Sequence, residues 1–265
     1  MKDLILASIS AACPWRDTLH WYDTIDSTNT RAKELAKQGA PHGTVLVAAA
    51  QTAGRGRLGR DFQSDRNMGV YLSAILRPEC PAEELMHLTC AVAVATCDAV
   101  QKVCGIRPDV KWINDLVWQK KKLGGILTEL AIDSKTGNVD YAVVGIGINC
   151  RQTIEDFPPH LQQIACSLLT ATGHSADTAA LAAALTEALW EMSGQLRSRA
   201  HWMACYRRDC ITLGQEVAVH RGEDTFYGTA LSVDDAGALV VRCSDGSERT
   251  VNSGEVSVRG LYGYV

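Results

Sequence analysis

Three glycines alternate with three arginines in the stretch Gly54–Arg60, which reads GRGRLGR. Glycine lets a backbone approach a ligand closely and present its N–H groups to it. Arginine adds a planar, permanently charged fork that suits phosphates and carboxylates. The stretch therefore predicts a loop that binds an anion. It lacks the Gly-Lys-Ser/Thr ending of a P-loop, and the alternative is a solvated basic loop.

Two further motifs place lysines at the ends of expected strands. Lys111-Trp112-Ile113-Asn114-Asp115 gathers a cation, an amide and a carboxylate within five residues. Lys122 precedes Gly124, Gly125 and an apolar stretch, so its ammonium could point inward from a strand start. Each motif has a plainer alternative. The first could be an exposed hairpin edge, and Lys122 could belong to a solvated run of three lysines.

Polar groups also stand at the ends of two other expected elements. Asp26-Ser27-Thr28-Asn29 comes directly before a helical pattern, where hydroxyl and amide groups could bind a polar ring or merely cap the helix. Gly145-Ile146-Gly147-Ile148-Asn149 ends an apolar strand, and its glycines would let a planar ring approach a sheet. Taken alone, neither motif is specific.

The elements that must position these residues follow from hydrophobic periodicity and turn residues. We expect a short helix at the N-terminus, and a polar loop from Gln51 to about Asn67. The further expected helices are 28–38, 81–105 and 178–208, and the expected strands are 44–50, 69–77, 109–118, 124–132 and 140–148. The turn at 119–123 would join two of these strands. The predicted fold class is α+β, with a mixed β-sheet flanked by helices.

From Gly214 onward the pattern changes to short alternating strands: QEVAVH, TFYGTALSV, GALVVRC and ERTVNSGEVSV. Turn residues such as Asp245-Gly246 separate them. This pattern predicts a small SH3-like β-barrel at the C-terminus. We therefore expect two domains, 1–211 for the ligand-binding part and 212–265 for the barrel.

Composition excludes several classes of protein. The 265 residues carry a formal net charge of −4, which argues against a general nucleic-acid binder. No apolar run is long enough to span a membrane. The ten cysteines form no CxxC pair, and Cys90, Cys97 and Cys104 recur every seven residues as expected for buried helix positions. The seven histidines are scattered, so we predict no protein-held metal site. A cytoplasmic location is expected.

The order of these motifs resembles the biotin–protein ligase family over roughly residues 20–150. Asp26–Asn29, Gln51 with GRGRLGR, KWIND, KLGGIL and GIGIN occur in the family's order, and the C-terminal barrel fits as well. The resemblance implies a class II synthetase-like catalytic domain. It also implies ATP, Mg²⁺ and biotin as ligands.

The resemblance further implies a role for each motif residue. Lys122, Arg57 and Asp115 would be catalytic, with Lys122 the main cation and Asp115 a candidate for contacting a metal or helping to deprotonate the acceptor lysine. Asn149 would lie near the adenine or the metal. The residues implied to bind biotin or nucleotide are Ser27, Thr28, Asn29, Gln51, Gly54, Arg55, Gly56, Arg57, Lys111, Asn114, Lys122, Gly124, Gly147 and Asn149.

The implied reaction has two steps. Biotin and ATP would form biotinyl-5'-AMP and pyrophosphate, and the biotin would then pass to a lysine of a biotin carboxyl carrier protein or an equivalent carboxylase domain. Asp26–Asn29 comes too early for the winged helix-turn-helix domain of many relatives, so we expect no binding to operator DNA. A homodimer is compatible with the resemblance.

The chain departs from the family pattern at three positions. Ile113 stands where proline is usual, Phe62 where an aromatic residue, most often tryptophan, is usual, and Asp65 where proline is common. Two rival functions also stay open at this point. A lipoate–protein ligase would share the architecture, and a non-catalytic biotin-binding or RNA-binding module could use the arginine-rich loop.

Overall fold

The computed structural model describes residues 1–222, 224–252 and 256–260. Its main part is a seven-stranded sheet in the order β1-β2-β3-β7-β6-β5-β4. Strands β1 and β2 are parallel, and the remaining neighbours pair antiparallel. The strands are β1 (Leu19–Tyr22), β2 (Thr44–Ala48), β3 (Gly69–Leu76), β4 (Asp109–Lys111), β5 (Asp115–Trp118), β6 (Lys121–Ile132) and β7 (Val139–Asn149).

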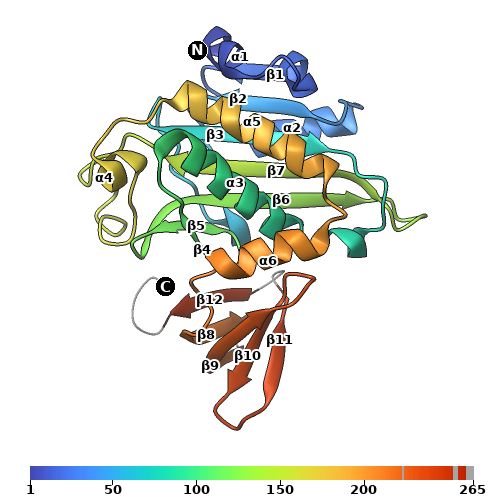
Figure 1. The fold of residues 1–265 in the computed structure, drawn as a ribbon, viewed down its shortest axis with the longest axis vertical. Coiled ribbons are helices and arrows are strands. Elements are labelled where there is room, and N and C mark those ends of the chain that lie inside the picture. The colour runs from blue at the N-terminus through green and yellow to red at the C-terminus, as the bar shows by residue number, and fades with distance from the viewer. Residues whose placement is uncertain (223, 253–255, 261–265) are drawn as a thin grey trace.

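Helices cover the two faces of this sheet unequally (Figure 1). Helices α3 (Leu88–Cys104), α5 (Thr178–Gly194) and α6 (Arg199–Asp209) lie on one face, with α1 (Lys2–Ser8) near the β1 edge. Helix α2 (Thr28–Lys37) packs on the opposite face against β2, β3 and β7. Helix α4 (Leu168–Thr172) and the 3-10 turns η1 (Pro14–Thr18), η2 (Arg57–Gly59) and η3 (Ala82–Leu85) complete the part.

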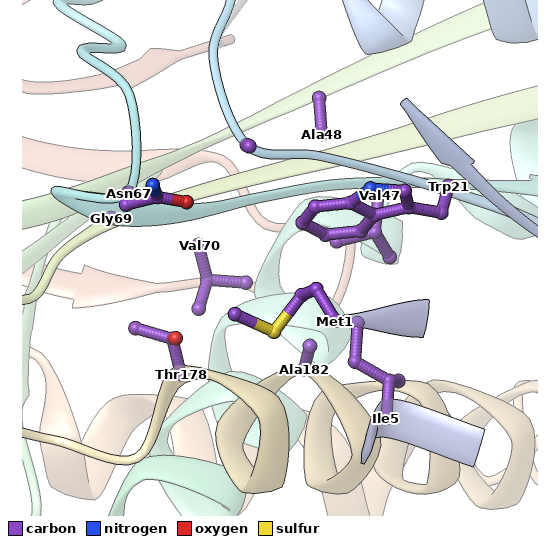
Figure 2. A pocket seen from close by; sticks show the side chains of 11 residues that line it. Met1, Ile5, Trp21, Val47, Ala48, Asn67, Gly69, Val70, Thr178 and Ala182 are labelled. Carbon is purple, nitrogen blue, oxygen red and sulfur yellow. The ribbon is translucent and has the colours of Figure 1, made fainter. Parts of the chain in front are cut away.

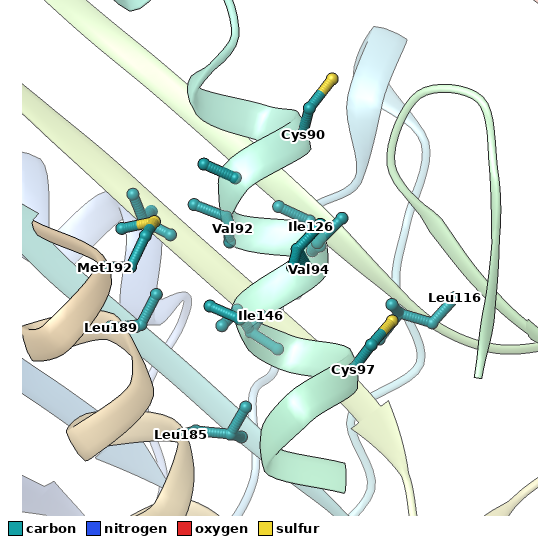
Figure 3. Close-up of a cluster of buried hydrophobic side chains, with 14 of the residues drawn as sticks. Cys90, Val92, Val94, Cys97, Leu116, Ile126, Ile146, Leu185, Leu189 and Met192 are labelled. Atoms are coloured by element: carbon teal, nitrogen blue, oxygen red, sulfur yellow. The ribbon is translucent and has the colours of Figure 1, made fainter. Parts of the chain in front are cut away.

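The larger core lies between the sheet and the helices α3 and α5. Figure 3 shows α3 presenting Cys90, Val92, Val94 and Cys97 among leucine, isoleucine and methionine side chains of its neighbours. Cys90 and Cys97 are fully buried and Cys104 is half-buried, which confirms the interpretation of the seven-residue repeat as packing. Burial raises the pKa of both fully buried thiols, so they stay protonated.

A second, five-stranded antiparallel sheet follows, in the order β11-β10-β9-β8-β12. Its strands are β8 (Glu216–Arg221), β9 (Asp224–Val233), β10 (Leu239–Cys243), β11 (Glu248–Val251) and β12 (Val256–Gly260). The mixed sheet with flanking helices and this C-terminal β unit confirm the predicted fold class. The expected strand 248–258 is two strands at opposite edges of the sheet, and its Ser253–Glu255 lies outside the described residues.

Three expected elements were wrong in extent. The helix from Pro81 is a 3-10 turn followed by α3, which ends at Cys104 and is capped by Gly105 with a φ of 73°. The strand 109–118 is the hairpin β4–β5, turning at Trp112–Asn114, with a cis peptide bond between Trp112 and Ile113. The helix 178–208 breaks at Gln195–Ser198 into α5 and α6. Strand β1 and helix α4 were missed.

Candidate functional site

Glycines open one face of the sheet beside the N-terminus of α2. In β7, Ile146 and Ile148 face the helical layer and its core, whereas Gly145 and Gly147 face the α2 side. Gly125 of β6 pairs with Gly147 and faces the same side. Because side chains alternate along a strand, these positions leave a floor without side chains in the middle of the sheet. We call Gly125, Gly145 and Gly147 the glycine floor.

Two side chains lie directly on the glycine floor. A Cβ atom at Gly145 would lie 2.0 Å from Asn29 Oδ1, and one at Gly147 would lie 2.6 Å from the Phe62 ring. The Phe62 ring also meets Tyr71 edge to face at 6.4 Å between centroids. Glycine is therefore required at both positions for these side chains to approach the sheet.

A neutral hydrogen-bonded network occupies the α2 end of the floor. Ser27 caps the helix by accepting from the Thr30 N–H, and Ser27, Thr28 and Asn29 are all buried. The Ser73 hydroxyl donates to Asn29 Oδ1 at 2.6 Å and lies 2.8 Å from the Thr28 hydroxyl. These groups come from a helix and a strand far apart in sequence, and burial makes their mutual satisfaction necessary.

The network extends into the loop 51–67 through Gln51. Its Oε1 accepts from the Thr28 N–H at 2.8 Å and from the Thr28 hydroxyl at 3.0 Å. Its Nε2 donates to the Ser64 hydroxyl at 2.8 Å, and that hydroxyl donates to the Phe62 carbonyl. We call Thr28, Asn29, Gln51, Ser64 and Ser73 the neutral network. It joins α2, β3 and the arginine-rich loop.

Glu129 of β6 closes the other end of the neutral network. The Asn29 amide donates to Glu129 Oε2 at 3.0 Å and to the Leu127 carbonyl at 3.2 Å. Lys33 donates to Glu129 Oε1 at 2.7 Å, and Arg55 lies 4.0 Å away. Burial works to raise the pKa of Glu129, but the bonds from Lys33 and Asn29 bring it below its ordinary value. The carboxylate thereby fixes the orientation of the Asn29 amide.

The GRGRLGR stretch is a closed turn rather than an extended loop. The Gly56 N–H donates to the Arg60 carbonyl at 2.7 Å, and the Phe62 N–H donates to the Gly54 carbonyl at 2.9 Å. A Cβ atom at Gly54 would lie 2.3 Å from the Phe62 carbonyl, so only glycine fits there. At the tip, exposed Leu58 has a φ of 55°. The turn projects Arg57 toward β5.

Basic side chains gather where β4, β5 and β6 begin or end. Lys122 Nζ forms an ion pair with Asp115 Oδ1 at 2.7 Å. Arg57 donates to Asn114 Oδ1 at 3.1 Å, and burial lowers the pKa of this guanidinium. Asn114 in turn donates to the Ile126 carbonyl, which fixes its amide. We call Arg57, Lys111, Asn114, Asp115 and Lys122 the cationic cluster.

Lys111 is the most buried lysine of this cluster, with 8% of its surface exposed. Burial lowers its pKa from 10.5 to about 8, Asp115 acts in the opposite direction, and Lys122 adds to the lowering. Three basic side chains, Arg57, Lys111 and Lys122, therefore lie close to the Asp115 carboxylate. Basic side chains grouped in this way suit a polyanion such as a triphosphate.

Asn149 and Gly124 complete the predicted set. Asn149 is buried at the end of β7 and donates to the Cys166 carbonyl at 3.0 Å. It lies on the same face of the sheet as the glycine floor. Gly124 pairs with Ile148, so it occupies a position of the helical face, and a Cβ atom there would meet the Gly147 carbonyl at 2.4 Å. Its close approach to β7 sets the spacing of the two strands.

Sequence reasoning missed Ser73 and Glu129. Each is the conspicuous polar residue in an apolar strand, GVYLSAILR and GGILTELAI, and that contrast was the available signal. Their partners lie 44 to 100 residues away in sequence, so the contacts themselves could not be foreseen.

The hollow drawn in Figure 2 is a different place. It lies on the helical face among Met1, Ile5, Trp21, Val47, Val70, Thr178 and Ala182, and its lining includes none of the predicted site residues. In the described part of the chain, no three histidine, cysteine or carboxylate side chains are grouped to hold a metal ion. No helix there is long and apolar enough to cross a membrane.

Comparison with known proteins assigns the family. The Biotin/lipoate A/B protein ligase family matches residues 21–149, and the Biotin protein ligase C terminal domain matches residues 212–259. The Bacillus subtilis (strain 168) protein "Bifunctional ligase/repressor BirA" is 35% identical over 250 residues, covering 87% of this chain and 71% of the relative. A "Biotin--[acetyl-CoA-carboxylase] ligase" from Mycobacterium tuberculosis is 32% identical, covering 92% and 88%.

A solved structure supports the same assignment. "Biotin protein ligase from Aquifex aeolicus in complex with biotin and ATP" superposes with a TM-score of 0.77 at 29% identity, covering 92% of this chain and 99% of that one. Together with the neutral network and the cationic cluster on one sheet face, these matches show that the chain belongs to the biotin–protein ligase family, the ATP-dependent enzymes that attach biotin to protein.

Proposed function

We propose that the neutral network holds biotin, that the cationic cluster holds ATP, and that the two ligands meet over the glycine floor. The observation that carries this division is the contrast in charge between two polar groups of residues on one face of one sheet. Biotin offers a neutral ureido ring, whose N–H and C=O groups match the hydroxyls and amides around Thr28, Asn29 and Ser73. The triphosphate, a polyanion, suits the basic side chains grouped around Lys111 and Lys122.

In the first step, a biotin carboxylate oxygen attacks the α-phosphate of ATP, and pyrophosphate leaves. Both reactants are anions, so their repulsion and the charge on the leaving group must be offset. Arg57, Lys111 and Lys122 supply that compensation, and the Lys122–Asp115 ion pair holds the Lys122 ammonium in place. Asn114 orients Arg57 through its amide oxygen.

The mixed anhydride formed in this step is readily hydrolysed, so water must be excluded from it. Phe62 and the closed turn around Gly56 lie over the floor and would shield the adenylate. Ser27 caps the helix whose first residues bind the ring, and Arg55 next to Glu129 stands at the biotin side. These placements support the cofactor-binding roles expected from the motifs.

In the second step, a neutral lysine amine of the carrier attacks the anhydride carbonyl, and AMP leaves. Asp115 is the carboxylate within the cationic cluster and is our candidate acceptor of the amine proton. Mg²⁺ would be held mainly by the phosphates, with Asp115 as its candidate protein ligand, and would offset phosphate charge. Asn149 would contact the adenine.

We propose a biotin carboxyl carrier protein or equivalent carboxylase domain as acceptor, a cytoplasmic location and an assembly compatible with a homodimer. The ten cysteines are unpaired, which fits a reducing compartment. We also propose a division at 211/212, supported by the gap between α6, which ends at Asp209, and β8, which begins at Glu216.

Biotin-dependent exchange of labelled pyrophosphate into ATP tests the proposal. The unaltered chain should catalyse it with biotin and fail without biotin. Labelled biotin should enter a carrier domain, and labelled lipoate should not. Exchange that is absent, or that follows lipoate rather than biotin, would contradict the proposed function.

A further inference from the structure

Lys111 and Asn114 are the ends of a turn, and both are held by the sheet. The two residues between them are held by other parts of the molecule. Lys111 pairs with Asp115 in the β4–β5 hairpin, and Asn114 exchanges hydrogen bonds with Ile126 of β6. The two residues between them, Trp112 and Ile113, are both buried. Their hydrogen bonds lead away from the sheet.

Three hydrogen bonds fasten Trp112 and Ile113 to α6 and to the C-terminal unit. The Trp112 backbone N–H donates to the Thr212 hydroxyl oxygen at 2.9 Å, and the Trp112 indole N–H donates to the Gly237 carbonyl at 3.0 Å. The Tyr206 hydroxyl donates to the Ile113 carbonyl at 3.1 Å. All three bonds are buried, so losing one partner leaves a polar group without compensation from water.

The turn of the C-terminal unit that contains Gly237, whose carbonyl accepts from Trp112, is itself rigid. Asp234 accepts from the backbone N–H groups of Ala236 and Ala238, and the Gly237 N–H donates to the Asp234 carbonyl. Gly237 has a φ of 86°, and a Cβ atom there would lie 3.1 Å from the Cys90 sulfur of α3. The turn therefore fits closely against the helical layer and offers its carbonyl to Trp112 in a fixed position.

We infer that Thr212 and the Gly237 carbonyl position the cationic cluster, acting through Trp112. The C-terminal unit thereby sets the separation of Lys111 from Asn114 and Asp115, and with it the affinity for the triphosphate. Thr212 and Trp112 are positioning residues, because none of their atoms needs to touch the nucleotide. This inference rests on the proposed role of the cationic cluster in ATP binding.

The discriminating substitution is Thr212→Val, which keeps the shape of the side chain and removes the oxygen that accepts from Trp112. We expect KM for ATP to rise about three- to tenfold, as for loss of a buried hydrogen bond, while KM for biotin stays within about twofold. Thr212→Ser restores the acceptor and should restore KM for ATP. Trp112→Phe removes the indole donor and should shift the same parameter.

Asp235→Asn is the matched control. Asp235 lies in the same turn as Gly237 but is exposed, pairs with the half-buried Arg207 and makes no bond to Trp112. It should leave both KM values unchanged. Equal rises of both KM values in Thr212→Val, or a lowered Tm with unchanged KM for ATP, would overturn the inference and leave the proposed function intact. Absence of biotin-dependent exchange in the unaltered chain would overturn both.

Discussion

The neutral network and the cationic cluster occupy the same sheet face but are built on opposite principles. In the neutral network, Thr28, Asn29, Gln51 and Ser73 satisfy one another, so the group is oriented before any ligand arrives. Pre-orientation favours recognition of a neutral ring by directed hydrogen bonds, because little ordering is left to be done on binding.

The cationic cluster instead gathers charged side chains in a partly buried place. Lys122 has Asp115 as partner, yet burial still lowers the pKa of Lys111 and of Arg57. Bringing a polyanion here relieves that electrostatic cost. The contrast teaches that the neutral network contributes pre-oriented hydrogen-bonding groups, whereas the cationic cluster contributes charge. Substitutions in the two groups should therefore have different effects.

Lys122→Ala should have the largest effect. Removing this cation should lower the rate of adenylation by about 10²- to 10³-fold, as for other groups that stabilise developing charge. KM for biotin should change little. Pyrophosphate exchange and circular dichroism measure activity and fold, and Lys121→Ala provides a neighbouring lysine outside the cluster. Unchanged exchange in Lys122→Ala would remove its assigned role.

Ser73→Ala should have the next largest effect and act on the opposite half. Asn29 Oδ1 would lose a buried donor, which costs about 1–3 kcal/mol. KM for biotin should rise about tenfold while KM for ATP holds. Thr128→Val breaks a hydrogen bond to Thr89 on the helical side of the sheet, so it should lower Tm without moving KM for biotin. The reverse pattern would refute the division of the site.

Raising the pH should lower kcat/KM for ATP by a smaller factor than these substitutions change their parameters. The pKa of Lys111 is about 8 in the folded chain against 10.5 ordinarily. As pH rises through about 8, the ammonium becomes neutral, and kcat/KM for ATP should fall by about three- to tenfold by pH 9. Lys111→Met should abolish this decline. A decline that persists in that variant would assign it to another group.

The lowered pKa of Lys111 also predicts how the stability of the ligand-free chain changes with pH. The unfolded chain binds the Lys111 proton more tightly than the folded chain does between pH about 8 and 10.5. The Lys111 contribution to the free energy of unfolding should therefore increase as pH rises through that window. Comparing the urea midpoint of Lys111→Met with that of the unaltered chain at several pH values isolates it.

Glu129→Gln should have the smallest effect. The amide keeps an acceptor for Asn29 but loses the charge that attracts Lys33 and Arg55. Because both partners are partly exposed, the ion pairs should contribute about 1 kcal/mol or less. We expect KM for biotin to change no more than about twofold. A loss as large as that of Ser73→Ala would mean that the neutral half depends on charge after all.

Most of the fold could be predicted from hydrophobic pattern and turn residues. Long apolar strands such as 69–77 and 140–148 and the capped helix at Thr28 lie within a few residues of their expected positions. The errors arose where tertiary contacts replace local signals. Trp112 and Ile113 are apolar and read as strand, but bonds from Tyr206 and to Thr212 fix them in a turn. Strand β1 is short and edge-located, so its pattern was weak.

The site residues likewise divide into those that a sequence motif could predict and those that only tertiary contacts bring into the site. Motif residues such as Lys122 and Gln51 could be found because their neighbours in sequence carry a distinctive spacing. Ser73 and Glu129 carry no motif, and their importance comes from the Asn29 side chain of α2, which bonds to both across the sheet. Gly125 and Gly145 likewise matter through strand register, which the sequence does not display.

The alternation of glycine and isoleucine in β6 and β7 has a consequence for changes in chain length. Gly145 and Gly147 face the α2 side of the sheet, and Ile146 and Ile148 face the core. A one-residue insertion or deletion within β7 would exchange these faces, placing isoleucine side chains on the glycine floor and removing them from the core. We expect related sequences to vary in length at the hairpin turn Asp133–Asn138, where the chain leaves the sheet, and to keep the strands themselves free of insertions and deletions.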